Sequence, residues 1–219
     1  MGPRIIRRRA QLYRAGALLA VILCLAARAF GDDVIERIVA VVGGDLITQS
    51  DVEAARVLGL LSPDARGRGG SAPTETRDIV ARLIDRSLML AEVDRYAPPE
   101  PSAAAVDQEV AAVRARFPTA DAFTHALAEV GMNDKYLRDQ LRENLRLQAY
   151  LDERFTVPPP GDEEIAAYYA LRSPSAPLDA VRSEIAAQIV AARRRTQVDE
   201  WVAGLRRRAQ ITEVGLTDR

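Results

Sequence analysis

The sequence has few of the side chains on which most enzyme and metal sites depend. One histidine, His125, and one cysteine, Cys24, occur among its 219 residues, whereas zinc sites need several of these side chains at short spacings. The sequence also lacks a nucleophile elbow, a P-loop and a phosphate-binding glycine motif. We therefore expect a protein that is not an enzyme, with no catalytic residue, no cofactor and no metal, and with His125 exposed on a short helix.

The sequence also lacks an apolar run of the roughly 20 residues that a membrane-spanning helix needs. The apolar run Ala15–Leu25 follows a segment rich in arginine and precedes the triplet Ala27-Arg28-Ala29. This order is typical of a secretory signal peptide. We expect residues 1–29 to be removed on export, which leaves a protein of the periplasm without an integral membrane span.

Residues 30–219 contain no cysteine, so no disulfide supports this part of the chain, as suits an oxidising compartment. They carry 24 basic and 31 acidic residues, a net charge of −7. The arginine triplets at 193–195 and 206–208 could follow a phosphate backbone. The acidic balance and the absence of aromatic residues within either triplet argue against a nucleic-acid partner, and we expect both triplets to be solvated.

A glycine pair gives the clearest local signal. Gly43 and Gly44 separate the β-rich run Val34–Val42 from Leu46-Ile47, a pattern that predicts a small hairpin. Thr48 precedes Asp51 by three residues, and Ser50 precedes Glu53 by the same interval, so either hydroxyl could cap a following helix. Because a two-stranded hairpin is marginal by itself, a third strand or a helix must cover it.

The rest of the chain is predicted to form helices separated by proline, glycine and serine. After a loop over Ser62–Pro73, apolar spacing and capping residues predict helices over 74–96, 102–117, 119–130 and 133–155, another that begins at 162, and a long one over 178–209. Gln210–Val214 alternates like a strand, and we expect it to pair with Ile38–Val42. The predicted fold is therefore mainly α, with a small hairpin completed by a C-terminal strand and a long C-terminal helix.

Several of these segments resemble, in the same order, the N-terminal region of the SurA-type periplasmic chaperones. The shared positions are Ile38–Val42, Ile47, Thr48, Ser50 and Asp51, then Leu83-Ile84-Asp85 with Leu88, then Phe123, Leu127 and Gly131, then Tyr136 and Leu141–Leu145. The resemblance implies a SurA-like helical domain over 30–172. In that family a parvulin-type prolyl isomerase domain would follow. Here residues 173–177 form a short linker, and 178–219 are expected to pack back on the first domain.

The resemblance implies an exported chaperone-like protein that binds unfolded or extended polypeptide clients, outer-membrane proteins among them, without isomerase chemistry. Met89 and Leu90 widen the apolar face of the 74–96 helix. Either this helix is buried on two sides, or it offers clients an adaptable surface. Bulky residues beyond a single helix stripe are the candidate peptide contacts: Leu88, Met89, Phe123, Met132 and Tyr136.

Two alternatives remain open. The long closing helix could join a structural or adaptor subunit to one fixed partner, or to a second copy in a homodimer. The protein could also be a prolyl isomerase. The apparent absence of a parvulin domain argues against this last function, because parvulin sites use a histidine pair with an aspartate or cysteine.

Overall fold

The structure, a computed structural model, describes most of the chain beyond the predicted signal peptide. The described ranges are 36–61, 75–172 and 176–214. The predicted signal peptide over 1–29 and the predicted loop Ser62–Pro73 lie outside the described residues, as does part of the predicted linker over 173–177. The division of the chain at this linker stays a prediction.

The predicted hairpin is confirmed from Ile38 onward. Strand β1 (Ile38–Val42) pairs antiparallel with strand β2 (Asp45–Thr48). Gly43 and Gly44 join them with φ angles of 60° and 105°, which glycine adopts without the steric cost that a side chain would bring. The glycine pair therefore fixes where the chain reverses.

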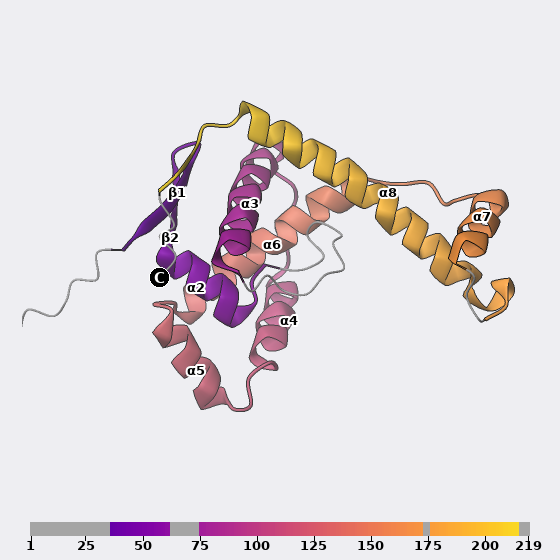
Figure 1. Ribbon diagram of the computed structural model, residues 1–219. Coiled ribbons are helices and arrows are strands. Elements are labelled where there is room, and N and C mark those ends of the chain that lie inside the picture. Colours follow the sequence, from indigo (N-terminus) through magenta and orange to yellow (C-terminus); the bar gives the residue numbers. More distant parts are fainter. Residues whose placement is uncertain (1–35, 62–74, 173–175, 215–219) are drawn as a thin grey trace, which may run out of the picture. The chain divides into compact units, whose positions relative to one another are not determined.

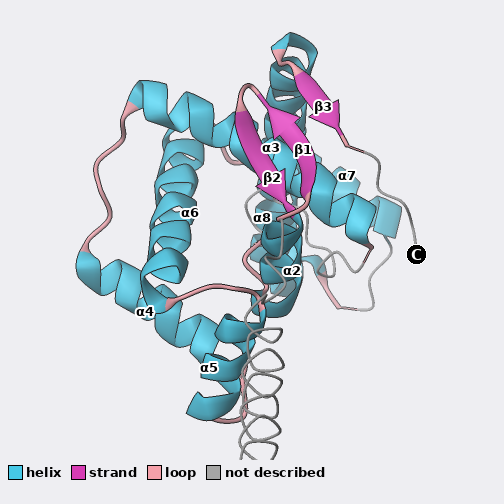
Figure 2. Ribbon diagram, turned by 90° about the vertical axis from the view of Figure 1, so that its left-hand side faces the viewer, coloured by secondary structure: helices cyan, strands magenta, loops and turns pink. Residues whose placement is uncertain are grey.

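The closing strand completes this hairpin as predicted. Strand β3 (Ile211–Glu213) pairs antiparallel with β1, with Val42 opposite Ile211 and Ala40 opposite Glu213. The sheet order is β2-β1-β3, and Figure 2 shows the three strands side by side with β1 in the middle. The last strand thus supplies the partner that a lone hairpin lacks.

Helices make up most of the described chain, so the mainly α fold is confirmed. They are α2 (Gln49–Leu58), α3 (Thr76–Tyr96), α4 (Ala103–Arg114), α5 (Ala120–Glu129), α6 (Asp134–Arg154), α7 (Asp162–Arg172) and α8 (Leu178–Arg208). The predicted boundaries lie within a few residues of these ends, because capping residues and prolines mark them in the sequence.

The caps show why the helices begin where they do. Thr48, not Ser50, caps α2: its backbone N–H donates to Asp51 Oδ2 at 2.9 Å, and its hydroxyl accepts from the Asp51 N–H at 3.3 Å. The hydroxyls of Ser102 and Thr119 accept in the same way at the starts of α4 and α5. Helices α3 and α8 have no side-chain cap, because Glu75 and Pro177 stand at their N-caps without such a hydrogen bond.

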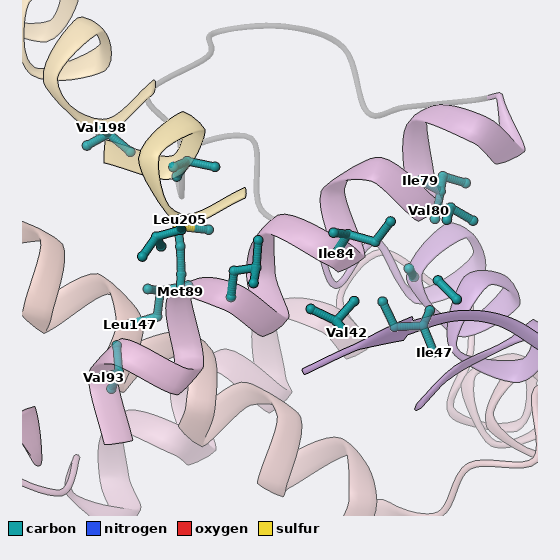
Figure 3. Close-up of a cluster of buried hydrophobic side chains, with 14 of the residues drawn as sticks. Val42, Ile47, Ile79, Val80, Ile84, Met89, Val93, Leu147, Val198 and Leu205 are labelled. Atoms are coloured by element: carbon teal, nitrogen blue, oxygen red, sulfur yellow. The ribbon is translucent and has the colours of Figure 1, made fainter. Parts of the chain in front are cut away.

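Helix α3 lies at the centre of the main hydrophobic cluster. It contacts α2, α6, α8, β1 and β2, and its residues Ile79 and Ile84 are fully buried. Figure 3 shows the cluster, to which the sheet contributes Val42 and Ile47, α6 contributes Leu147, and α8 contributes Val198 and Leu205. Of the two explanations for the wide apolar face of α3, burial on two sides is confirmed.

Two further clusters lie away from the first. One joins α2, α4, α5 and α6 through side chains such as Leu58, Val110 and Leu137. The other is small and joins α7 to the N-terminal part of α8 through Ile165, Ile185 and Ile189. The C-terminal part of α8 therefore packs against α3, and the N-terminal part of α8 packs against α7 (Figure 1).

An ion pair inside the protein joins α3 to α8. Asp85 is 4% exposed and is the one buried charged residue among those that the structure describes. Arg206 donates from Nε to Asp85 Oδ1, and from Nη2 to the Ala81 carbonyl at 2.8 Å. A buried charge is costly unless it is paired, so this contact fixes where α8 lies along α3.

The expectation that both arginine triplets are solvated is therefore wrong for Arg206, and also for two members of the other triplet. Arg193 pairs with Glu164 of α7 at 2.5 Å, and Arg194 pairs with Asp152 of α6. Each of these arginines has an acidic partner on another helix. The pairs of Arg193 and Arg194 are about half exposed, so they contribute little to stability. The sequence does not show these partners, since each lies far away along the chain.

Replacing Arg206 by methionine is expected to lower the free energy of unfolding by about 3 kcal/mol. This is the lower end of the range for removing one partner of a buried pair, because Arg206 keeps 35% of its side chain exposed. The measurement is urea unfolding at neutral pH. Arg207→Met is the neighbouring control and should change stability by about 0.5 kcal/mol or less.

A second variant separates lost charge pairing from lost packing. Combining Arg206→Met with Asp85→Leu removes both charges, and an apolar pair in the place of an ion pair is often as stable. We expect the double variant to be more stable than Arg206→Met alone. A double variant that is less stable than Arg206→Met would contradict this explanation.

Candidate functional site

A groove of about 480 Å³ lies between strand β2 and the helices α3 and α6. We call it the β2 groove. Its lining residues come from β2 (Asp45, Leu46, Ile47), α2 (Asp51), α3 (Leu83, Arg86, Ser87, Leu90, Ala91, Asp94) and α6 (Tyr136, Gln140, Glu143, Arg146). Its volume falls within the range of small ligand sites.

A second groove, of about 580 Å³, lies on the other side of the β1–β2 turn. We call it the turn groove. It is lined by the turn, by α3 and by the end of α8 with the residues after it, and Leu88 borders it. Asp45, Ser87 and Ala91 line both grooves, so the two hollows adjoin where the turn meets α3.

The positive charges of the β2 groove are already engaged by neighbours. Arg86 donates to Glu143 Oε2 at 2.9 Å and to Asn144 Oδ1 at 2.9 Å. Arg146 pairs with Asp94 at 3.0 Å and with Glu100 at 3.3 Å. Both guanidinium groups therefore act inside the wall of the groove and are not presented to a ligand as bare cations.

Carboxylates outnumber guanidinium groups in this groove. Four acidic residues line it against two arginines, and Asp45 is exposed at the end of β2 next to the turn. Asp51 is used by the helix cap through Oδ2, while its Oδ1 accepts a hydrogen bond from the Tyr136 hydroxyl at 3.3 Å. The groove thus has a net negative and largely polar lining, in which the apolar residues are Leu46, Ile47, Leu83, Leu90 and Ala91.

Tyr136 borders one end of the β2 groove from the first turn of α6. Its side chain stays partly exposed, at 42% for the whole residue. Burial of the rest raises the pKa of its phenol, and the charge and hydrogen bond of Asp51 raise it further. The phenol therefore stays a neutral hydrogen-bond donor to a higher pH than an ordinary tyrosine.

The structure does not bring together the five residues that the sequence suggested as peptide contacts. Met89 is 2% exposed and lies in the main cluster with Leu147 and Leu205 (Figure 3). Phe123 is 3% exposed and lies in the α2–α4–α5–α6 cluster, its ring centroid 5.6 Å from that of Phe117. In this arrangement, neither Met89 nor Phe123 has a surface to offer a client.

The other three candidates lie in three different places. Leu88 is buried and borders the turn groove, Met132 packs partly buried against the α2–α4–α5–α6 cluster, and Tyr136 lines the β2 groove. In these helices, an apolar face wider than one stripe means that the helix is buried on more than one side, and its extra apolar residues belong to the core. Of the five, Tyr136 is the residue with both exposure and a place in a groove.

Most of the β2 groove was missed in the sequence. Arg86 and Glu143 form its wall through a contact between α3 and α6, and neither residue carries a local signal for this. Tyr136, proposed from the sequence as a contact, and Leu90, which belongs to the widened apolar face of α3, were the available hints. Leu90 is partly exposed and lines the groove together with β2 residues.

His125 is exposed on α5 as predicted, with 74% of its side chain accessible, and it lies 3.4 Å from Glu129.

Within residues 36–61, 75–172 and 176–214, no group of three or more histidine, cysteine, aspartate or glutamate side chains is placed to hold a metal ion. In the same ranges no helix combines the length and the apolar character needed to cross a membrane.

The raised pKa of Tyr136 predicts a loss of stability at alkaline pH. The phenol favours its neutral form more in the folded chain than in the unfolded one. Its contribution is therefore fully present below the ordinary tyrosine pKa of about 10 and is lost as the pH rises through the folded pKa. We expect the free energy of unfolding to fall more steeply above about pH 10 in the wild type than in Tyr136→Phe. Urea unfolding across that range measures this, and equal slopes would contradict it.

Comparison with known proteins gives no relative for this chain. Neither the known protein families nor the curated proteins provide a match. The resemblance in the short motifs therefore stays a prediction.

Proposed function

We propose that this protein is an exported, chaperone-like protein of the SurA type, which holds extended apolar segments of unfolded proteins, including outer-membrane proteins, without isomerase chemistry. The observation that carries the proposal is the β2 groove. There an exposed strand edge stands beside an open hollow whose largely polar lining includes the apolar side chains of Leu83 and Leu90. Extended segments need both an apolar surface for side chains and polar partners for the backbone.

The order of the elements supports the proposal. A hairpin, a group of helices, a long helix and a strand that returns to the hairpin follow one another along the chain. This is the order that the resemblance to the SurA-type chaperones led us to expect. The region between α7 and α8 is too short for a parvulin domain, since Arg172 and Leu178 end and begin adjacent helices.

Export is part of the proposal and is supported by sequence alone. The positive segment, the apolar run and the small residues before position 30 have the order of a signal peptide. The lack of cysteine after that position suits an oxidising compartment. Clients in the periplasm would be polypeptides that have crossed the inner membrane and have not yet folded.

Holding in this way is binding by many weak contacts. The arginines of the groove are paired, and its apolar surface is limited to a few side chains such as Leu83 and Leu90. Affinity among related complexes is governed mainly by dissociation rates. A site without a deep anchoring pocket therefore favours fast release, which a chaperone needs.

A second candidate function has its own supporting observation. Helices α7 and α8 share a hydrophobic cluster that is separate from the rest, and Leu171 of α7 is 87% exposed. A surface of this kind suits a fixed partner or a second copy. The protein would then be an adaptor or a homodimer, and the β2 groove would have no part in its function.

Aggregation of an unfolded outer-membrane protein on dilution from urea tests the two candidates. The protein is recovered from an exporting host as the cell processes it, and is added at equal concentration. We expect suppression of light scattering by the wild type, and a clear loss of suppression in Leu46→Asp. Leu46 is 55% exposed at the groove, so the substitution changes the site without emptying the core.

Leu171→Asp is the matched control, because it places the same charge on an exposed leucine outside the groove. It should suppress aggregation as well as the wild type does. No suppression by the wild type would favour the adaptor function. Equal loss of suppression in both variants would contradict the β2 groove as the client site. Acceleration of cis–trans exchange in a proline peptide would show that the argument from the missing parvulin domain is wrong.

A further inference from the structure

The hydrogen bonds of the sheet show which backbone groups of β2 face outward. Gly43 N–H donates to the Gln210 carbonyl and Val214 N–H donates to the Val39 carbonyl, both at 3.0 Å. In an antiparallel sheet bonding alternates along a strand. Val39, Val41 and Gly43 therefore bond toward β3, and Ala40 and Val42 bond toward β2.

It follows that Leu46 turns its backbone away from the sheet. In the register of β1 and β2, Val42 lies opposite Asp45, Val41 opposite Leu46 and Ala40 opposite Ile47. Asp45 and Ile47 thus hold the bonds to β1, and the N–H and C=O of Leu46 point outward. Among the described residues, no hydrogen bond from another element reaches either group. Exposed edges of this kind are templates for pairing with another strand.

The outward edge of β2 opens on the β2 groove. Asp45, Leu46 and Ile47 all line the β2 groove. Neither of the two grooves described above includes a residue of β3. A strand added beside β2 would therefore lie over α3 and α6, where its side chains find Leu83 and Leu90.

The two faces of β2 define what such a strand must look like. Ile47 is 5% exposed and points to the core, whereas Leu46 is 55% exposed on the other face. An added strand shares this pleat, so its successive side chains alternate between the groove floor and solvent. Segments with apolar residues at every second position fit, and a shift by one residue would turn the apolar set to solvent.

Charge adds a second requirement. The groove has four carboxylates against two arginines that are already paired, and Asp45 stands exposed beside Leu46. A lysine or arginine on the added strand would meet a net negative lining, while an acidic residue would be repelled. The groove therefore favours basic over acidic residues in its ligand.

We propose that the outer edge of β2 binds an extended client as a fourth strand, and that it selects segments in which apolar residues alternate with polar or basic ones. This inference rests on the proposed client-binding function and states how the client is recognised. The Leu46 backbone gives the hydrogen bonds, Leu83 and Leu90 of α3 take the apolar side chains, and Asp45 favours a basic neighbour.

Backbone methylation of a ligand peptide tests the hydrogen bonds directly. The probe is a short fluorescein-labelled peptide in which valine alternates with lysine and threonine, and its binding to the full chain is measured by fluorescence polarisation. Two versions carry N-methyl groups on alternate residues, one on the odd set and one on the even set. Methylation of the set that faces β2 should weaken binding about tenfold, and methylation of the other set should leave it nearly unchanged.

Variants of the protein test the same contact from the other side. Leu46→Pro removes the outward N–H at an edge position, where proline is tolerated in sheets, and should weaken binding of the unmodified peptide. Asp45→Asn should weaken binding of the lysine-containing peptide about threefold and leave a version with threonine in place of lysine unchanged. Glu109→Gln, an exposed acid on α4 outside the groove, is the matched control and should bind both peptides as the wild type does.

The outcomes separate this inference from the proposed function. If the two methylated sets bind equally well while aggregation is still suppressed in a Leu46-dependent way, clients bind by side chains alone and strand addition is overturned. If no peptide binds and no aggregation is suppressed, the proposed function fails together with the inference. Strand addition is supported if only one of the two methylated sets weakens peptide binding and if this difference is lost in Leu46→Pro.

Discussion

The position of α8 on α3 depends on a buried carboxylate that needs a cationic partner. Asp85 is buried within the main cluster, and Arg206 reaches it from the last turn of α8 while also binding the Ala81 carbonyl. A buried carboxylate without a cation is strongly unfavourable, so α8 is held in one register. The chain then has β3 in place to pair with β1, and the sheet is complete.

The candidate site follows from this closure. Because β3 occupies one side of β1, the hairpin partner β2 stays at the edge of the sheet. The same sheet lies against α3, so the free edge of β2 stands above the helices α3 and α6. The groove is therefore formed by elements that meet through packing of the whole unit. Damage to the Asp85–Arg206 contact would reach it through the sheet.

Local features of the sequence were enough to predict most of the fold. Gly43-Gly44, the capping residues Ser102 and Thr119, and the prolines after Tyr96 mark turns and helix ends through the chemistry of single residues. The alternation of the closing strand allowed its pairing with β1 to be predicted. These signals act over a few residues, which is why they are visible without a structure.

The site was much less predictable, for reasons that are also physical. Periodicity shows which side of a helix is apolar, but it does not show how many neighbours cover that side, so Met89 and Phe123 were offered as contacts when they are core. Arg193 and Arg206 were expected to be solvated because their acidic partners, Glu164 and Asp85, lie on other helices. The free backbone of Leu46 depends on the order of the strands, which is a property of the assembled sheet.

The most direct test of the account is amide hydrogen exchange at Leu46, measured by NMR in the full chain with and without an unfolded client. The outward N–H of an edge strand should exchange rapidly in the free protein and be protected when the client adds as a strand. We predict that protection appears at Leu46 and among the α3 and α6 residues of the β2 groove. An unchanged Leu46 amide, with protection confined to α7 and the N-terminal part of α8, would contradict the account and identify the α7–α8 cluster as the interaction surface.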